Sequence, residues 1–315
     1  MFKALLIGCG NIGAMYDWEN EQVLTHAKAF SKFDEINVDY FDLNNQQASM
    51  VADRYNGNLV FDVDIAIQNE FYDIISICTP TPTHYNFLFK ALKRKTPVII
   101  CEKPISTNKS EINELMNLYS VSESKVLINY FRRFQPSFVK VQDIITDLQK
   151  SDELTNVSIR YQRGFINNCS HALDLLQFLF QEEFIPTNFI INRKDFDHFD
   201  NDPTVTACCE WMNANINILG LQNIKYSNFE IDLYFNKTKI LIQNSGNDIL
   251  FFEMENLNIG FSMIEIQNQN NMSKCIENYM LPVAEKALNL LKNNWDDNFN
   301  ESILLNKTIL NILNN

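Results

Sequence analysis

The sequence predicts an α/β protein in which a doubly wound parallel sheet is followed by an α+β domain with a large, mostly antiparallel sheet. In the first 129 residues, short apolar runs alternate with helical patterns, which is the order of βαβ units. From Pro136 onward, several runs alternate apolar and polar residues with a period of two, which is typical of antiparallel strands. We therefore expect two domains, over residues 1–125 and 126–315.

The composition argues against several classes of partner and site. A net charge of −13 disfavours nucleic acid and anionic membranes, because both attract clustered Lys and Arg. The seven cysteines are scattered, with no Cys-x-x-Cys pair and no histidine at zinc-ligand spacing, so we expect reduced, mostly buried thiols and no metal site. No apolar run approaches membrane-spanning length and the chain opens directly into a strand, so we expect a cytoplasmic protein.

The first strand, Phe2 to Ile7, leads into a glycine motif with the spacing Gly-x-Gly-x-x-Gly. Gly8 allows a tight turn, Gly10 lets the backbone approach a pyrophosphate, and Gly13 permits close packing of a following helix whose N–H groups face the anion. This pattern predicts a dinucleotide-binding Rossmann domain. The residues expected to contact the cofactor are Gly8, Gly10, Asn11, Ile12 and Gly13.

An acidic residue ends the second predicted strand, Ile36 to Asp42. A carboxylate there accepts hydrogen bonds from the adenosine ribose and repels a 2′-phosphate, so Asp42 favours NAD over NADP. The distance from the glycines exceeds the usual ~20 residues. The segment Tyr16 to Leu24 interrupts the first helical pattern, which resumes at Thr25.

The rest of the first half continues the βαβ pattern. Thr79 and Pro80 follow the fourth strand, where they can line the face of a cofactor. The remaining expected elements are helices at 46–55, 84–94 and from 108, and strands at 59–61, 74–78, 97–101 and 125–129.

Lys103 lies in Glu102-Lys103-Pro104, directly after the apolar run that forms the fifth strand. The carboxyl end of a parallel strand faces the crevice where ligands bind, and a partly desolvated ammonium there can carry a proton. A lysine that packs along the surface and pairs with Glu102 is the alternative, and position alone does not separate the two. Pro104 fixes its own φ and allows a cis Lys103–Pro104 bond.

In the second half, a small polar segment meets the start of a helix at 170–180. His171 falls in its first turn, and Asp174 lies three residues later on the same face, where it can orient the imidazole. His26, His84 and His198 lack such a partner in the sequence, so we expect them to be structural or exposed. The other expected elements are strands at 154–163 and 229–235 and helices at 136–147, 283–293 and 301–313.

The order of these motifs resembles the glucose–fructose oxidoreductase, inositol dehydrogenase and MocA (Gfo/Idh/MocA) family. The resemblance includes Arg133-Phe134-Gln135-Pro136 after the sixth strand. It implies an NAD(P)-dependent dehydrogenase acting on a secondary hydroxyl or keto group of a sugar, nucleotide sugar or cyclitol. In that comparison Lys103 and His171 flank the reacting carbon and Asn167 binds substrate, while Thr79, Pro80, Glu102 and Lys103 contact the cofactor. It also implies a homodimer or homotetramer built through the second sheet.

Two positions depart from the family pattern, because Asn167 and Cys169 stand where many members have Asp and Gly. This departure supports an alternative function, a non-catalytic sensor that binds a dinucleotide or a sugar. An oxidoreductase for amino or imino compounds is a weaker alternative. Lys103 and His171 favour the enzyme, because a pure binding protein has little need for such a pair of titratable groups. Four arginines could bind a nucleotide-sugar phosphate or be ion-paired: Arg132, Arg133, Arg160 and Arg163.

Overall fold

The computed structural model describes residues 1–257, 260–265, 270–293 and 295–314. Its contacts group into two compact units: the first combines 1–134 with 278–307, and the second combines 135–277 with 308–315. The expected boundary between residues 125 and 126 differs from this division. The sixth strand of the first sheet ends after that boundary, and a segment near the C-terminus returns to the first unit.

The first unit contains a six-stranded sheet with the order β3-β2-β1-β4-β5-β6, and every pairing in it is parallel. This order confirms the predicted doubly wound sheet. The sequence of each strand is a nearly continuous apolar run, because helices cover both faces of the sheet. They are β1 (Phe2–Ile7), β2 (Ile36–Phe41), β3 (Asn58–Leu59), β4 (Ile74–Ile77), β5 (Val98–Cys101) and β6 (Lys125–Ile128).

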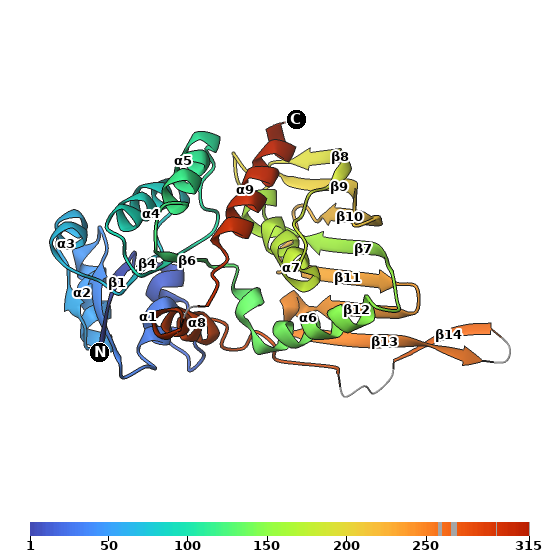
Figure 1. Ribbon diagram of the computed structural model, residues 1–315, viewed down its shortest axis with the longest axis horizontal. Helices are drawn as coiled ribbons and strands as arrows, with labels where there is room; N and C mark the ends of the chain where they lie inside the picture. The colour runs from blue at the N-terminus through green and yellow to red at the C-terminus, as the bar shows by residue number, and fades with distance from the viewer. Residues whose placement is uncertain (258–259, 266–269, 294, 315) are drawn as a thin grey trace. The chain divides into compact units, whose positions relative to one another are not determined.

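Figure 1 shows α4 and α5 on one side of this sheet and α1 and α8 on the other. The short helix α3 was not predicted from the sequence. The helices are α1 (His26–Phe30), α2 (Asn45–Tyr55), α3 (Val63–Asn69), α4 (His84–Lys93), α5 (Lys109–Tyr119) and α8 (Leu281–Lys292), followed by α9 (Phe299–Asn314), which continues into the second unit.

Residues near the C-terminus complete the first unit. Apolar side chains of α8 and the residue before it join the core around β1, β2 and β5, namely Met280, Val283, Ala284, Ala287 and Leu290. The outer edge of β6 is closed by side chains: Val126 N donates to Asp297 Oδ2 (2.7 Å), and Ile128 exchanges two hydrogen bonds with the Asn298 amide (both 2.9 Å). These bonds satisfy backbone groups that an open strand edge would expose.

The segment between the glycine motif and α1 is anchored by a buried carboxylate. Asp17 is fully buried, and its oxygens accept from Leu24 N (2.6 Å), Thr25 N (2.9 Å) and Thr25 Oγ1 (2.8 Å). A five-residue π-helical turn, Asn11–Met15, comes before the interruption predicted at Tyr16 to Leu24. The helix resumes at His26 with Thr25 as its N-cap, as predicted.

The second unit contains an eight-stranded sheet with the order β14-β13-β12-β11-β7-β10-β9-β8. Among the strand pairs that the structure describes in this sheet, only β7–β10 is parallel, so the predicted, mostly antiparallel sheet is confirmed. The strands are β7 (Leu154–Tyr161), β8 (Thr187–Asp195), β9 (Thr204–Trp211), β10 (Ala214–Gly220), β11 (Phe229–Phe235), β12 (Thr238–Gln243), β13 (Asp248–Leu257) and β14 (Gly260–Glu265).

One face of this sheet is covered by α6 (Pro136–Leu148) and α7 (Ser170–Phe180), as Figure 1 shows. The other face is mostly polar. Near its centre Arg160 binds Glu230 (2.8 Å) and Asp232 (2.8 and 2.9 Å). Ile190, Leu219 and Tyr234 expose 56%, 45% and 36% of their surface, and strand pairing places them on this same face.

Candidate active site

The glycine loop has the backbone that its spacing predicts. Gly8 has a φ of +98°, and a Cβ at this position would lie 2.9 Å from the carbonyl of Cys78 and 3.0 Å from Thr79 N. At Gly13 a Cβ would lie 2.0 Å from Gly8 O, so the turn can close only around a glycine. The loop after β1 therefore packs directly against the loop after β4.

Gly10 differs from these two glycines. A Cβ added there would have no protein atom within 4 Å. Packing of the chain does not explain a glycine at this position. An open backbone surface is what a dinucleotide pyrophosphate requires for close approach, so the loop fits the predicted cofactor.

Asp42 lies beside this loop. Its Oδ2 accepts from Cys9 N (2.8 Å) and its Oδ1 accepts from Asn44 N (2.8 Å). The residue is partly exposed, and each carboxylate oxygen has a second lone pair that can accept a ligand hydroxyl. The structure thus brings together the glycines and the acid that were predicted to bind a dinucleotide.

Lys103 follows β5 at the carboxyl edge of the sheet, and the residue before it is held by buried partners. Glu102 Oε1 accepts from Asn129 Nδ2 (2.6 Å) and lies 3.1 Å from His26 Nε2. The other ring nitrogen of His26 lies 2.9 Å from Ser76 Oγ. The Glu102 carboxylate is therefore held by buried partners from two other segments of the unit.

His26 and Glu102 shift each other's pKa. Burial alone would lower the pKa of His26, but contacts with Cys78 and Glu102 outweigh burial and raise it. Burial alone would raise the pKa of Glu102, whereas the hydrogen bond and charge of His26 lower it, and the charge of Lys103 adds to that effect. Both shifts favour the charged forms of this buried pair.

The residues after Lys103 are also anchored within the first unit. The Lys103–Pro104 bond is cis. His84 is buried, with Nδ1 2.7 Å from Pro104 O and Nε2 2.6 Å from Thr79 O. Asn306 accepts from Ile105 N (2.9 Å) and Ser106 N (3.3 Å) and donates to Ser106 O (2.9 Å). Lys103 thus projects from a loop that is fixed on both sides.

Sequence reasoning missed these supporting residues. His26 and His84 were expected to be structural, and their partners lie 76 and 20 residues away, so no local spacing reveals them. Asn129 could have been found, because it directly follows the sixth strand at the edge where ligands bind. No feature of the sequence indicates that Asn306 binds the backbone of the loop after Lys103.

In the second unit, Asn167, His171 and Asp174 lie on one continuous segment. A π-helical turn, Phe165–Cys169, leads into α7, where His171 and Asp174 are buried. Asn167 Nδ2 donates to Arg163 O (3.1 Å). The predicted orientation of His171 by Asp174 stays a prediction, as does the meeting of His171 with Lys103, because those two residues belong to different units.

Asp202 anchors the start of this segment and was not predicted from the sequence. Its two oxygens accept from Ile166 N and Asn167 N (both 2.7 Å). A Cβ on Gly164, where φ is +85°, would lie 2.1 Å from the same carboxylate. The glycine therefore makes room for Asp202, which fixes the backbone that carries Asn167.

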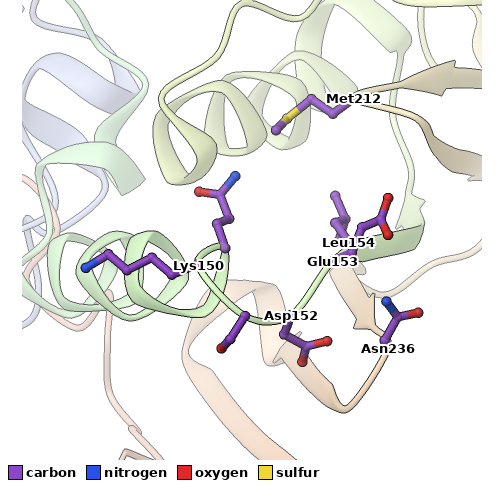
Figure 2. Close-up of a pocket in the computed structure, with 8 residues that line it drawn as sticks. Lys150, Asp152, Glu153, Leu154, Met212 and Asn236 are labelled. Carbon is purple, nitrogen blue, oxygen red and sulfur yellow. The ribbon is translucent and has the colours of Figure 1, made fainter.

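A pocket of about 410 Å³ lies elsewhere in the second unit, around the end of α6. Figure 2 shows that its labelled lining includes Lys150, Asp152 and Met212. None of the predicted site residues lines it.

Among the residues that the structure describes, no group of three or more His, Cys, Asp or Glu side chains is placed to hold a metal ion. No helix in the described part of the chain is both long and apolar enough to cross a membrane.

Two of the four predicted arginines are seen to bind acidic partners in their own units. Arg160 binds Glu230 and Asp232, and Arg133 Nη1 donates to Glu301 Oε2 (2.8 Å). The seven cysteines are free thiols, as predicted, and all except the partly exposed Cys208 are buried.

Comparison with known proteins connects these features to a family. Residues 2–130 match the family model described as an oxidoreductase family with an NAD-binding Rossmann fold. The first part of the chain is thus similar to the Gfo/Idh/MocA oxidoreductase family. An inositol 2-dehydrogenase of Rhizobium meliloti (strain 1021) is 28% identical over 192 residues, which are 56% of this chain and 54% of that relative. The match thus spans about half the length of that relative.

Solved structures resemble the chain over nearly its whole length. A levoglucosan dehydrogenase in complex with NADH and levoglucosan has a TM-score of 0.78 at 13% identity, covering 99% of this chain and 96% of that one. A putative myo-inositol dehydrogenase from Sinorhizobium meliloti 1021 has a TM-score of 0.70 at 18% identity, covering 98% and 95%. These likenesses show that the fold is shared beyond residue 130 as well.

Proposed function

We propose that the protein is an NAD-dependent dehydrogenase acting on a secondary hydroxyl or keto group of a sugar, nucleotide sugar or cyclitol. The observation that carries this proposal is Lys103, an amine on a loop anchored on both sides, at the ligand-binding edge of a sheet from an NAD-binding family. The names of the inositol and levoglucosan dehydrogenases support the substrate class.

The proposed chemistry assigns a role to each predicted residue. His171 accepts the proton of the substrate hydroxyl, and Asp174 keeps its imidazole oriented. Lys103 donates a hydrogen bond to the same oxygen, so its positive charge stabilises the developing alkoxide. Asn167 holds a neighbouring hydroxyl. A bound nicotinamide supplies the hydride acceptor, and the glycine loop with Thr79 and Pro80 would hold the dinucleotide.

The first test removes the two proposed catalytic groups. Lys103→Ala and His171→Ala should each reduce kcat by about 10²–10⁴-fold, which is the usual contribution of one positioned acid or base. NAD affinity should change little, because neither side chain is expected to carry most of the dinucleotide binding. The assay follows NADH absorbance with a panel of free sugars, cyclitols and nucleotide sugars. Turnover near the wild-type rate in both variants would contradict the assignment.

The same panel also tests the sensor alternative. Tight NAD binding without turnover on any of these substrates would favour a binding protein over an enzyme.

The coenzyme preference rests on Asp42. Its carboxylate lies beside the glycine loop, where it accepts ribose hydroxyls and repels a 2′-phosphate. Asp42→Ala should therefore weaken NAD binding and bring the NAD and NADP dissociation constants closer together. Titration of both coenzymes by protein fluorescence measures this change. An unchanged ratio would remove Asp42 from the site.

We also propose that the protein forms a homodimer or homotetramer through the polar face of the second sheet. On that face Leu219 lies directly opposite Arg160, and the exposed side chains of Ile190 and Tyr234 add further apolar surface. Light scattering coupled to size-exclusion chromatography tests this proposal, and a monomer across the micromolar range would refute it.

A further inference from the structure

His84 is a buried histidine to which the proposed chemistry assigns no role. It is 1% exposed and begins α4 on the same face as the buried residues Leu88, Ala91 and Leu92. Packing at such a position needs only an apolar side chain, because burial of polar nitrogens costs free energy unless hydrogen bonds replace those to water. The reason for an imidazole at this position therefore lies in its polar contacts.

The two ring nitrogens of His84 face different loops. Nε2 lies 2.6 Å from Thr79 O in the loop after β4, and Nδ1 lies 2.7 Å from Pro104 O in the loop after β5. A carbonyl oxygen can only accept, so the ring binds a loop through each nitrogen that carries a proton, and it binds both loops as an imidazolium. One side chain thus reaches two loops at the edge of the sheet where ligands bind.

The loop after β4 connects His84 to the glycine motif. Thr83 Oγ1 donates to Pro80 O (2.8 Å) and to Thr79 Oγ1 (2.7 Å), which ties this loop to the start of α4. On the other side of the loop, Thr79 N would lie 3.0 Å from a Cβ on Gly8. A displacement of Thr79 would therefore disturb the backbone that is proposed to bind the pyrophosphate.

The loop after β5 connects His84 to Lys103. Pro104 directly follows Lys103, and its carbonyl faces Nδ1 of His84. Asn306 accepts from the next backbone N–H group, that of Ile105, at 2.9 Å. His84 thus joins Asn306 as an anchor on the C-terminal side of Lys103, and its second nitrogen extends that anchor to the loop after β4.

We propose that His84 is a positioning residue that joins the loop proposed to hold the dinucleotide to the loop that carries Lys103. Through its two nitrogens, one side chain keeps both loops in a fixed relation. The inference rests on the proposed function for the roles of the two loops, but the link between them is a property of the first unit without any ligand.

Two substitutions at His84 separate the two contacts. The amide nitrogen of His84→Asn takes the place of Nδ1 and keeps the bond to Pro104 O, whereas that of His84→Gln takes the place of Nε2 and keeps the bond to Thr79 O. Hydrogen–deuterium exchange of the protein without ligand, followed by mass spectrometry, should become about tenfold faster over residues 79–83 in His84→Asn and over residues 102–107 in His84→Gln, because loss of a hydrogen bond eases local opening. Each variant should leave the other segment within about twofold of wild type.

Further variants control for a loss of packing. His84→Leu removes both bonds but keeps an apolar side chain, so exchange should be faster in both segments. His198→Asn and His198→Gln make the same changes at a histidine of the second unit and should alter neither segment. Faster exchange over both segments in His84→Asn and His84→Gln alike, or over neither, would overturn the inference. If His84→Leu does not fold, the Asn and Gln variants decide, because each retains one bond.

The same crossed pattern is expected in coenzyme binding and turnover. His84→Asn should raise the NAD dissociation constant about tenfold with little change in kcat at saturating NAD, whereas His84→Gln should lower kcat about tenfold and leave NAD affinity within about twofold. Equal losses of affinity in the two variants would contradict the assignment of one nitrogen to each loop. If wild type binds no NAD or turns over no substrate, the proposed function fails, while the exchange measurements still confirm or refute the link through His84.

Discussion

A single lysine acquires its proposed role from residues distant in the sequence. The side chain of Lys103 is unremarkable in isolation, but His26, His84 and Asn306 anchor the residues immediately before and after it. Each anchor comes from a different element. The orientation of a catalytic group is therefore a property of the folded unit as much as of its own loop.

The three glycines of the loop allow a matched pair of substitutions. Gly13→Ala should destabilise the protein by about 2 kcal/mol or more, because its methyl group would lie 2.0 Å from Gly8 O. Gly10→Ala should leave stability within about 0.5 kcal/mol, because the methyl group meets no protein atom. It should nevertheless weaken NAD binding by about tenfold, or 1.4 kcal/mol. Urea unfolding and NAD titration measure the two effects, and equal affinities for wild type and Gly10→Ala would contradict the proposed approach of the pyrophosphate.

At the residue scale, the sequence predicted the site residues that have a characteristic spacing along the chain. The glycines and Asp42 follow a pattern set by the shape of a dinucleotide, so they could be recognised in advance, and the structure brings them together. His26, Asn306 and Asp202 could not be recognised, because their contacts join segments far apart in the chain and any of several polar residues could make them.

At the scale of elements, the apolar strands of the first sheet were predicted closely. Predicted and observed ends of β1, β4, β5 and β6 agree within about a residue, because buried parallel strands are nearly continuous apolar runs bounded by polar residues or Pro. The helix α3 was missed, because its seven residues are too few for a clear periodic pattern. The interruption before Thr25 was predicted, and the structure adds its anchor, because Asp17 binds the backbone at Leu24 and Thr25.

The loop after β5 depends on an element from the far end of the chain. Asn306 on α9 is buried and makes three hydrogen bonds to Ile105 and Ser106. Asn306→Ala should lower the free energy of unfolding by about 2–3 kcal/mol, because buried backbone groups lose their partners. Asn117→Ala, at an exposed position of α5, is the control and should change stability by less than about 0.5 kcal/mol. Urea unfolding gives both values, and similar stabilities for the two variants would rule out the anchoring role.

At the scale of the whole molecule, the first unit is not continuous in sequence. Its core needs Met280, Val283, Ala284, Ala287 and Leu290, and its edge strand β6 needs Asp297 and Asn298. The sequence predicted two domains in order along the chain, since both C-terminal helices have ordinary amphipathic patterns. Such a pattern shows that a helix packs on something, but it does not identify the partner.

A fragment of residues 1–134 should therefore not fold, although it contains all six strands of the first sheet. The part of its core that packs against α8 would lack the apolar side chains of that helix. Joining residues 278–307 to it through a flexible linker should restore cooperative thermal unfolding, measured by circular dichroism. A cooperative transition in the 1–134 fragment alone would show that the C-terminal segment is dispensable.

This division of the first unit also has a consequence during synthesis. A ribosome releases residues 1–134 first and must then translate all of 135–277 before the covering segment exists. At ~5–20 residues per second, the apolar surface destined for α8 remains uncovered for roughly 7–30 s. A nascent chain in that interval is a substrate for chaperones, and a premature stop codon in the second unit would leave both units incomplete.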